Sequence, residues 1–300
     1  MGGMGEKATE ARHPKSAGLH LAAAGDVFGH LLDAQLAAVS CIRPVFKALE
    51  DAAEAGASAL RQGHRMAYVG AGSSGLMALA DCLELMGTFG ILPDRTPMLF
   101  AGGAAALLQM TGAVEDDPAL AEADFARADL GPGDVVICLS ASGGTPYTLV
   151  VARAAKGRGA QVVGMANVAG SPLLDIADFP VLLDTGPEVI SGSTRMGAAS
   201  AQKVALNMLS VLVGIRLGHV HDGYMVNVIA DNAKLVDRAA RIVAAVSGQD
   251  MLTAQEALAA SEGAVKPAIL IARGAAPDRA RAVLHASEGH LTPALAAISN

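Results

Sequence analysis

The stretch AYVGAGSSG at residues 67–75 decides how the chain is interpreted, because it joins a short apolar run to a glycine-rich turn. Its glycines fit the pattern G-x-G-x-x-G, which follows the first strand of dinucleotide-binding folds. Such sites usually carry an acidic residue at the end of the second strand, where it binds the ribose. The next apolar run, TPMLFAGG at 96–103, ends in alanine and glycine instead. The pattern therefore argues against NAD, and the two serines of the turn need another explanation.

Apolar runs of strand length alternate with helical segments along the middle of the chain. Strands that are apolar throughout, separated by crossover helices, indicate a parallel sheet covered on both faces. We therefore predict an α/β fold: a three-layer α/β/α, doubly wound, parallel five-stranded sheet with flanking N-terminal helices and a small C-terminal helical appendage. The five expected strands lie within residues 65–72, 96–103, 134–144, 160–167 and 179–185.

Changes of texture divide the chain into three parts. Residues 1–54 form a polar lead-in followed by Ala/Leu-rich helices, which Pro44 should interrupt. The α/β domain occupies residues 55–245, which contain the apolar runs and the glycine-rich turns. Residues 246–300 are predicted to form a small subdomain of short helices separated by glycine and proline.

The composition limits the classes of protein to which the chain can belong. Of its 300 residues, 52 % are apolar and 17 % charged, which is typical of a globular protein. A net charge of −7 and the scarcity of aromatic residues argue against a nucleic-acid partner. The three cysteines lie far apart, and the pair His219 and His221 has no carboxylates at ligand spacing. We therefore expect neither a disulfide framework nor a metal.

Two further absences concern localisation. No uninterrupted apolar run is long enough to span a bilayer, and the N-terminus lacks a charged-then-apolar signal. We expect a cytoplasmic protein with no membrane partner.

Three hydroxyl-rich turns precede predicted helices at the carboxyl ends of strands. A helix N-terminus offers unpaired N–H groups and a partial positive charge, which favour a phosphate. Any one of these turns could be a helix cap and nothing more. Three at one edge of a sheet favour binding of a mononucleotide or a sugar phosphate. The candidate phosphate-binding residues are Gly72, Ser73, Ser74, Ser140, Ser142, Thr145, Ser193 and Thr194.

The motifs GAGSSG, LSASGGTP and GSTR, in this order, resemble the sugar isomerase (SIS) fold, which binds phosphosugars. More closely, the chain resembles the N-acetylmuramic acid 6-phosphate etherases over nearly its whole length. The segments that carry this resemblance are TEARHP at 9–14 and the longer stretches 70–90, 101–117, 187–210 and 225–243.

The resemblance implies a carbon–oxygen lyase of amino-sugar catabolism that needs neither metal nor cofactor. Such an enzyme cleaves the D-lactyl ether of its substrate and yields N-acetylglucosamine 6-phosphate and D-lactate. A base removes the C2 proton, which the C1 aldehyde acidifies, and an acid protonates the departing oxygen on C3. Water then adds to the unsaturated aldehyde.

The two catalytic glutamates of the family correspond to Glu84 and Glu115. Glu84 lies in an apolar helical segment, so we expect it to be partly buried and to act as the acid. Glu115 is then expected to be the base at C2. Without the resemblance, Glu84 reads as an exposed helix position and Glu115 as part of a solvated acidic loop.

The chain departs from the family pattern where that pattern usually has cations, at Leu76, Gly144 and Gly197. The departures concern recognition of the lactyl carboxylate, or the identity of the sugar, more than phosphate binding. They leave two alternatives of the same fold: a phosphosugar aldose–ketose isomerase and a non-catalytic sugar-phosphate-binding regulator. The cations that remain in the family motifs are Arg12, Arg195 and Lys203.

The Ala/Leu-rich helices within residues 18–62 and 200–217 are more apolar than a lone domain needs. Members of the family are usually homodimers. We therefore expect these helices to pack in a homodimer, which could complete each site from the partner.

Overall fold

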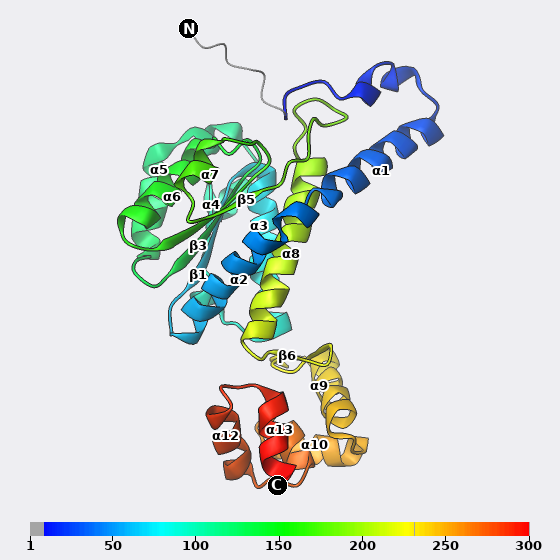
Figure 1. Ribbon diagram of the computed structural model, residues 1–300, viewed down its shortest axis with the longest axis vertical. Coiled ribbons are helices and arrows are strands. Elements are labelled where there is room, and N and C mark those ends of the chain that lie inside the picture. Colours follow the sequence, from blue (N-terminus) through cyan, green and yellow to red (C-terminus); the bar gives the residue numbers. More distant parts are fainter. Residues whose placement is uncertain (1–8, 231, 300) are drawn as a thin grey trace. The chain divides into compact units, whose positions relative to one another are not determined.

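The computed structural model describes residues 9–230 and 232–299 (Figure 1). The first eight residues of the polar lead-in, and Asp231 within the family-like segment 225–243, lie outside the described residues. The chain forms two compact units. The first unit consists of Met1–Cys82 and Asp94–Ser210, and the second of Leu83–Pro93 and Val211–Asn300.

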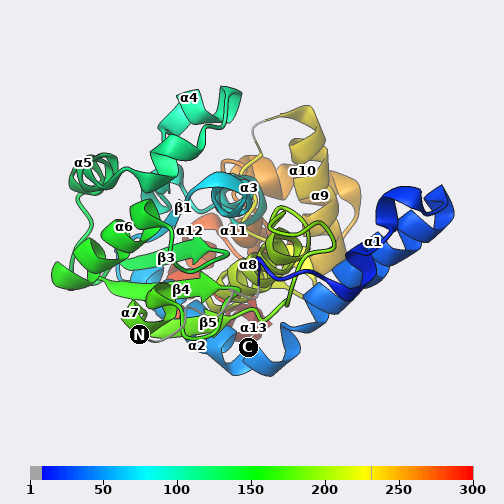
Figure 2. The same cartoon turned by 90° about the horizontal axis from the view of Figure 1, so that it is seen from above.

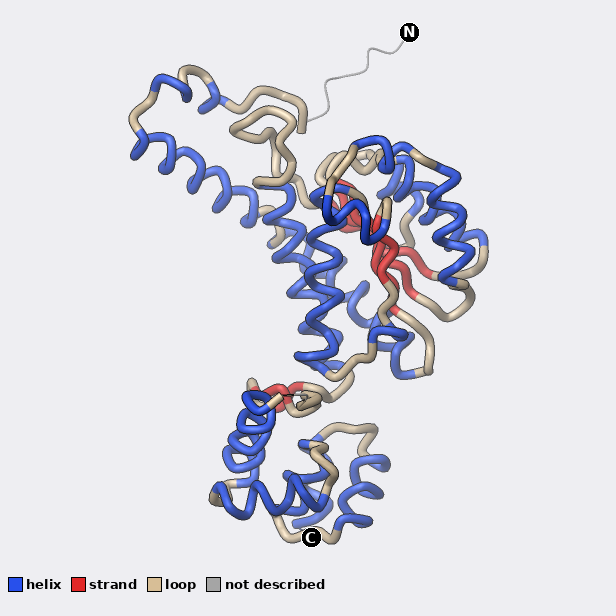
Figure 3. The backbone as a smooth tube through the Cα atoms, turned by 180° about the vertical axis from the view of Figure 1, so that it is seen from behind, coloured by secondary structure: helices blue, strands red, loops and turns tan. Residues whose placement is uncertain are grey.

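A parallel sheet forms the centre of the first unit (Figure 3). It has five strands in the order β2-β1-β3-β4-β5. Every residue of β1 and β3 is buried, because helices cover both faces of the sheet. This arrangement confirms the predicted doubly wound, three-layer α/β/α fold. The strands are β1 (Met66–Gly70), β2 (Met98–Phe100), β3 (Val135–Ser140), β4 (Gln161–Ala166) and β5 (Phe179–Leu182).

Helices from different parts of the chain cover the two faces of the sheet (Figure 2). Neighbouring residues of a strand point to opposite faces. Val69 packs in one apolar cluster with residues of α5, α6 and α7, whereas Tyr68 donates a hydrogen bond to Asp81 of α3. The first face carries α5 (Pro118–Ala128), α6 (Pro146–Gly157) and α7 (Pro172–Ile176). The opposite face carries α2 (Phe46–Arg61), α3 (Gly72–Phe89) and α8 (Gly197–Arg216).

The N-terminal helix α1 (Ala24–Ser40) is separated from α2 by the 3-10 turn η3 (Arg43–Val45). This turn contains Pro44, so the expected interruption is confirmed. Among the described helices, α8 has the length and apolar composition of a membrane span, and more than half of that stretch is buried, as in a core helix. The remaining short elements are η1 (Pro14–Ser16), η2 (Leu19–Leu21), η4 (Pro93–Arg95), α4 (Gly103–Leu108) and η5 (Gly112–Asp116).

The second unit is helical apart from a small antiparallel hairpin of β6 (Val220–His221) and β7 (Tyr224–Met225). The sequence Ala-Ser-Glu-Gly occurs at 260–263 and at 286–289, and in both copies the Glu and the Gly have positive φ. Helix α9 shares one apolar core with the later helices, although the change of texture at residue 246 suggests a boundary after it. The helices are α9 (Ala233–Ser247), α10 (Met251–Ala260), α11 (Val265–Ala272), α12 (Pro277–Ala286) and α13 (Leu291–Ser299).

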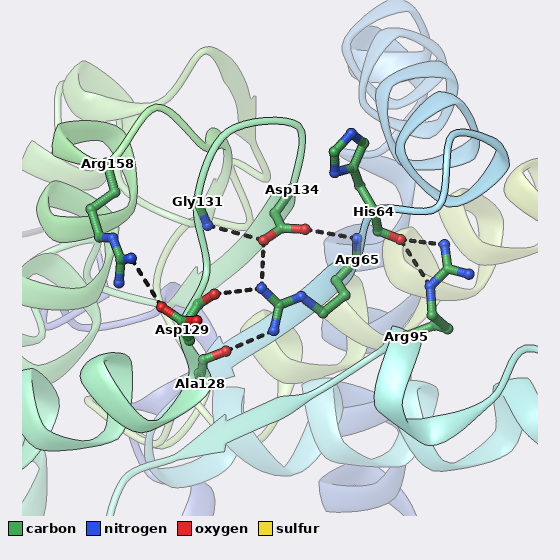
Figure 4. A network of polar contacts seen from close by, with 8 residues as sticks. All are labelled: His64, Arg65, Arg95, Ala128, Asp129, Gly131, Asp134 and Arg158. Atoms are coloured by element: carbon green, nitrogen blue, oxygen red, sulfur yellow. Dashed lines mark hydrogen bonds and ion pairs between the residues drawn. The ribbon is translucent and has the colours of Figure 1, made fainter.

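A polar network holds the amino ends of the central strands together (Figure 4). The buried carboxylate of Asp134, just before β3, accepts hydrogen bonds from the backbone N–H groups of Arg65 at 2.8 Å and Gly131 at 3.0 Å. The Arg65 guanidinium lies 2.9 Å from the same carboxylate and donates to the carbonyl of Ala128 at 2.8 Å. Burial alone would raise the pKa of Asp134, but these hydrogen bonds and the Arg65 charge together lower it.

We expect Asp134→Asn to reduce the free energy of unfolding by about 1–3 kcal/mol at neutral pH, because a buried, charge-assisted network loses an acceptor. A carboxyl with a lowered pKa stabilises the fold above its unfolded pKa, and the stabilisation is lost as pH falls through the folded value. The difference between wild type and variant should therefore shrink below about pH 4. Urea unfolding at several pH values measures it. Asp129→Asn, at an exposed left-handed position of the same network, should change stability little, and an equal loss there would contradict the interpretation.

Candidate functional site

The carboxyl ends of β1 and β3 form the topological switch point of the sheet. From β1 the chain crosses to β2 on one side, and it returns to place β3 on the other side. In doubly wound sheets such a point leaves a crevice in which ligands bind. Gly70 at the end of β1 pairs with Leu139 of β3, and neighbouring strands lie about 4.8 Å apart. The loops 70–75 and 140–145 are therefore neighbours at this crevice.

The loop after β3 gathers three hydroxyl groups at the start of α6. Ser140 Oγ lies 2.8 Å from Thr145 Oγ1 and 3.4 Å from Ser142 Oγ. The backbone N–H of Gly144 donates to Ser142 Oγ at 3.2 Å. Thr145 is the N-cap residue of α6 and makes no side-chain capping hydrogen bond. Pro146 occupies the first turn, where its fixed φ favours the helix.

Glu115 of η5 brings a carboxylate to the first turn of α3, just after β1. Gly72 has a φ of +53°, and a Cβ atom there would lie 2.6 Å from Oε1 of Glu115. Only glycine therefore lets the carboxylate approach this closely. Ser74 is buried and Ser73 is half-buried in the same turn. The positive end of α3 thus faces an acidic side chain of the protein itself.

A second internal carboxylate caps α8. Glu188 is 5 % exposed, and its two oxygens accept hydrogen bonds from the backbone N–H groups of Gly197 and Ala198, both at 2.9 Å. The candidates Ser193 and Thr194 lie in the turns that lead into this capped helix, and both are half-buried.

The family-like N-terminal segment packs against the loop before α8. The backbone N–H of Gly192 donates to the carbonyl of Thr9 at 3.3 Å. Ser191 Oγ donates to the carbonyl of Glu10 at 2.7 Å. These contacts join residues at the two ends of the first unit.

The three hydroxyl-rich turns are therefore not equivalent. The helices α3 and α8 begin at carboxylates of the chain itself, whereas within the described residues the start of α6 has hydroxyl groups around it and no carboxylate bonded to it. A helix N-terminus without an internal anion is the better place for a bound phosphate.

The environment of Glu115 suits a general base. Its side chain is half-buried at a small cavity whose lining includes the apolar residues Phe100, Met110 and Val114. Burial raises the pKa of Glu115, and the negative charge of Asp116 raises it further. A raised pKa brings a carboxylate nearer the basicity that proton abstraction requires.

Glu84 lies near the other end of α3 and is exposed, as is its neighbour Leu83. The expectation of a partly buried Glu84 is therefore wrong. On this turn the buried side of the helix carries Asp81 and Leu85, so Glu84 falls on the outer side. Glu84 follows Gly72 by twelve residues of one continuous helix, which is about 18 Å along its axis.

The structure explains why the expected cation is missing at one of the three positions, Gly197. A Cβ atom at Gly197 would lie 3.1 Å from Ala38 Cβ of α1 and 3.1 Å from Glu188 Oε2, so the site is filled by neighbours. Nothing in the structure explains Leu76 or Gly144. Among the remaining cations, Lys203 is exposed on α8 and its ammonium contacts Asn207 Oδ1.

Besides Asp134, two buried acidic residues have no signal in the sequence, Glu188 and Asp81. Glu188 lies nine residues before the helix that it caps, beyond the spacing of a capping box. Asp81 lies inside an apolar helical run and has no local signal. Within the described residues no group of three or more His, Cys, Asp or Glu side chains could hold a metal. The cysteines Cys41, Cys82 and Cys138 are free.

The fold and the two neighbouring loops define a protein of the SIS class, and residues 39–167 match the SIS domain family model. A solved structure from Bacteroides fragilis, named for a phosphosugar isomerase involved in capsule formation, superposes with a TM-score of 0.53 at 20 % identity. The alignment covers 67 % of this chain and 95 % of that one. At this identity the likeness establishes the fold alone.

Full-length relatives identify the family. The N-acetylmuramic acid 6-phosphate etherase of Deinococcus radiodurans is 44 % identical, with 94 % of this chain and 93 % of the relative covered. The etherase of Rubrobacter xylanophilus is 40 % identical, with 93 % of each chain covered. The chain belongs to the N-acetylmuramic acid 6-phosphate etherase family.

We expect Asp116→Asn to lower the pKa of Glu115, because it removes the neighbouring negative charge that opposes ionisation. Carbon-13 NMR titration of the Glu115 carboxyl measures the shift. Asp117→Asn is the matched control: it removes one negative charge a residue further on, and asparagine keeps the N-cap that Asp117 provides for α5. Equal shifts in the two variants would contradict the assignment to Asp116.

Proposed function

We propose that the protein is a carbon–oxygen lyase that cleaves the D-lactyl ether of N-acetylmuramic acid 6-phosphate and releases N-acetylglucosamine 6-phosphate and D-lactate. The observation that carries this proposal is the place of Glu115, whose carboxylate lies against Gly72 in the loop beside the hydroxyl-lined start of α6. A base and a phosphate site are thus neighbours at one crevice. The full-length similarity to etherases favours this substrate over other phosphosugars.

The phosphate is proposed to bind at the start of α6. Ser140, Ser142 and Thr145 would supply hydroxyl donors there, and the first backbone N–H groups of the helix would add the positive end of its dipole. The carboxylates at the starts of α3 and α8 would repel a phosphate. In this arrangement Gly72, Ser73 and Ser74 face the sugar, and Ser193 and Thr194 are structural.

Glu115 is proposed to remove the C2 proton of the open-chain sugar. The C–H bond breaks, the proton passes to the carboxylate, and the electron pair is delocalised into the C1 carbonyl. The C3–O bond then breaks with its electrons on the lactate oxygen, which an acid protonates. Water adds at C3 and gives its proton to the carboxylate that had protonated the lactate oxygen, and C2 regains a proton from the Glu115 carboxyl group. Every step is a proton transfer, an elimination or an addition of water, so two carboxyl groups suffice.

Glu84 is proposed to be the acid, supplied by a second copy of the chain. Base and acid act on adjacent carbons, so both carboxyls must come within hydrogen-bond reach of one sugar. Within one chain Glu84 lies about 18 Å along α3 from Gly72, which Glu115 contacts. A site built from Glu115 of one subunit and Glu84 of the partner subunit avoids this separation.

Exposed apolar side chains support the homodimer. Leu83 beside Glu84 is 69 % exposed. Helix α1 carries a stripe of exposed residues at intervals of four, and α8 carries a second stripe. Exposed apolar stripes of this kind are typical of an interface. The stripe of α1 is Phe28, Leu32 and Leu36, and that of α8 is Met208, Val211 and Ile215.

The cytoplasm is the proposed location, because the three cysteines are free and reduced thiols persist there.

Incubation of the purified protein with N-acetylmuramic acid 6-phosphate, followed by an assay for D-lactate, tests the function. Release of lactate is expected. Interconversion of hexosamine phosphates without lactate would indicate the isomerase instead. Thermal stabilisation by a sugar phosphate without any product would indicate the regulator.

Substitutions of the two glutamates should block different steps of the reaction. We expect Glu115→Gln to abolish both lactate release and exchange of the C2 hydrogen with solvent deuterium, because the base is lost. Glu84→Gln should abolish lactate release, keep the exchange, and keep elimination of chloride from a C3-chloro analogue, which needs no acid. NMR follows both readouts. Loss of chloride elimination in Glu84→Gln would contradict its role as the acid.

Mixed dimers test whether the acid comes from the partner. Glu84→Gln and Glu115→Gln chains are expected to be inactive alone, but a mixed dimer contains one site with neither change. Random pairing should restore about a quarter of wild-type activity, since half of the dimers are mixed and each has one intact site of two. Differently tagged chains allow the mixed dimer to be isolated. No recovery in that species would place both glutamates in one chain.

A further inference from the structure

Asp81 is a buried carboxylate on α3 to which neither the family motifs nor the proposed chemistry assigns a role. It is 5 % exposed. Tyr68 OH donates to its Oδ2 at 2.9 Å, and Asn207 Nδ2 and Ser210 Oγ donate to its Oδ1 at 2.8 Å and 3.0 Å. The donors come from β1 and from α8, so one carboxylate joins three elements.

The donors are neutral groups held in fixed directions. Burying a carboxylate is costly unless hydrogen bonds replace its water. Burial raises the pKa of Tyr68 well above its usual value, and the nearby negative charge of Asp81 raises it further. The phenol therefore stays protonated and donates its hydrogen to the carboxylate. An apolar side chain at position 81 would pack against β1 and α8 without this cost. What the carboxylate adds is directionality, because it fixes the rotation and the height of this turn of the helix.

Asp81 stands one helical turn before Glu84, and residues three apart on a helix are neighbours on its surface. The side chains between and after these two residues differ sharply in exposure. Cys82 and Leu85 are buried at 8 % and 2 %, whereas Leu83 and Glu84 are exposed. Leu85 is buried in this turn, Cys82 Sγ donates to the carbonyl of Thr96 at 3.0 Å, and Asp81 accepts hydrogen bonds from both β1 and α8.

We propose that Asp81 is the positioning residue for the acid: through Tyr68, Asn207 and Ser210 it fixes the turn of α3 that presents Glu84 to the substrate. The inference rests on the proposed function of Glu84. Asp81 itself touches no reacting atom. A shift or rotation of this turn would leave the phosphate site and Glu115 unchanged and would misplace the acid alone.

The chain offers a matched control for this inference. Tyr68 and Tyr147 are both fully buried, and each donates its phenol to an aspartate, Tyr147 OH to Asp124 Oδ2 at 2.8 Å. The second pair joins α6 to α5 and lies away from the turn of Glu84. Tyr68→Phe and Tyr147→Phe therefore remove the same atom from the same kind of pair, and thermal unfolding should show comparable losses of stability.

The steady-state parameters should differ between the two variants. We expect Tyr68→Phe to lower kcat for lactate release by roughly tenfold or more, with KM changed less than about threefold, because displaced catalytic groups slow the chemical step. Exchange of the C2 hydrogen and elimination from the C3-chloro analogue should stay at wild-type rates. Tyr147 stands in the first turn of α6, where the phosphate is proposed to bind, so Tyr147→Phe should act on KM and change kcat for lactate release by less than about threefold. Ser210→Ala, which leaves Asn207 and Tyr68 in place, should give a smaller loss in the direction of Tyr68→Phe.

Three results would overturn the inference. Equal losses of kcat in Tyr68→Phe and Tyr147→Phe would show that Asp81 stabilises the fold and does not position Glu84. A loss of chloride elimination as large as the loss of lactate release in Tyr68→Phe would show that the base is disturbed too. A wild-type protein that releases no lactate would overturn the proposed function together with the inference, whereas the first two results leave the function standing.

Discussion

The proposed site depends on which helix N-termini at the carboxyl edge of the sheet already face a carboxylate of the chain itself. Parallel strands bring several helix N-termini to this edge, and each presents unpaired N–H groups and partial positive charge. Glu115 lies against the start of α3, and Glu188 caps the start of α8. At α6 the described residues provide hydroxyl groups and no bonded carboxylate. In the proposed arrangement the start of α6 binds the phosphate of the substrate, whereas carboxylates of the chain itself lie at the starts of α3 and α8.

The length of helix α3 limits how the groups of the proposed reaction can be arranged. Its first turn contacts Glu115, and Glu84 lies about 18 Å further along the axis. A base and an acid for adjacent carbon atoms cannot be that far apart. The same geometry gives the exposed apolar stripes of α1 and α8 a function beyond burial of surface, because association would bring an acid to each base. In the proposed arrangement the dimer is a condition of catalysis.

Buried carboxylates recur throughout the first unit, each with a different purpose. Asp134 joins β1 and β3 through Arg65 and backbone N–H groups, and Glu188 caps a helix. Asp81 binds neutral donors from β1 and α8 next to the turn of Glu84. A buried ion stabilises less than its contacts suggest, because desolvation opposes them. Such residues are better understood as groups that fix the direction and register of the strands and helices they join.

The sequence by itself determined the five-stranded parallel sheet, the helix break at Pro44 and the family, because these depend on local periodicity, proline chemistry and ordered motifs. Only the tertiary structure decided at which of the hydroxyl-rich turns the described residues provide no bonded carboxylate. It also decided that Glu84 is exposed and that Asp81 lies between β1 and α8. These facts depend on contacts between residues far apart in the chain, such as Asp81 with Asn207 and Gly72 with Glu115, and neither propensity nor spacing records such contacts.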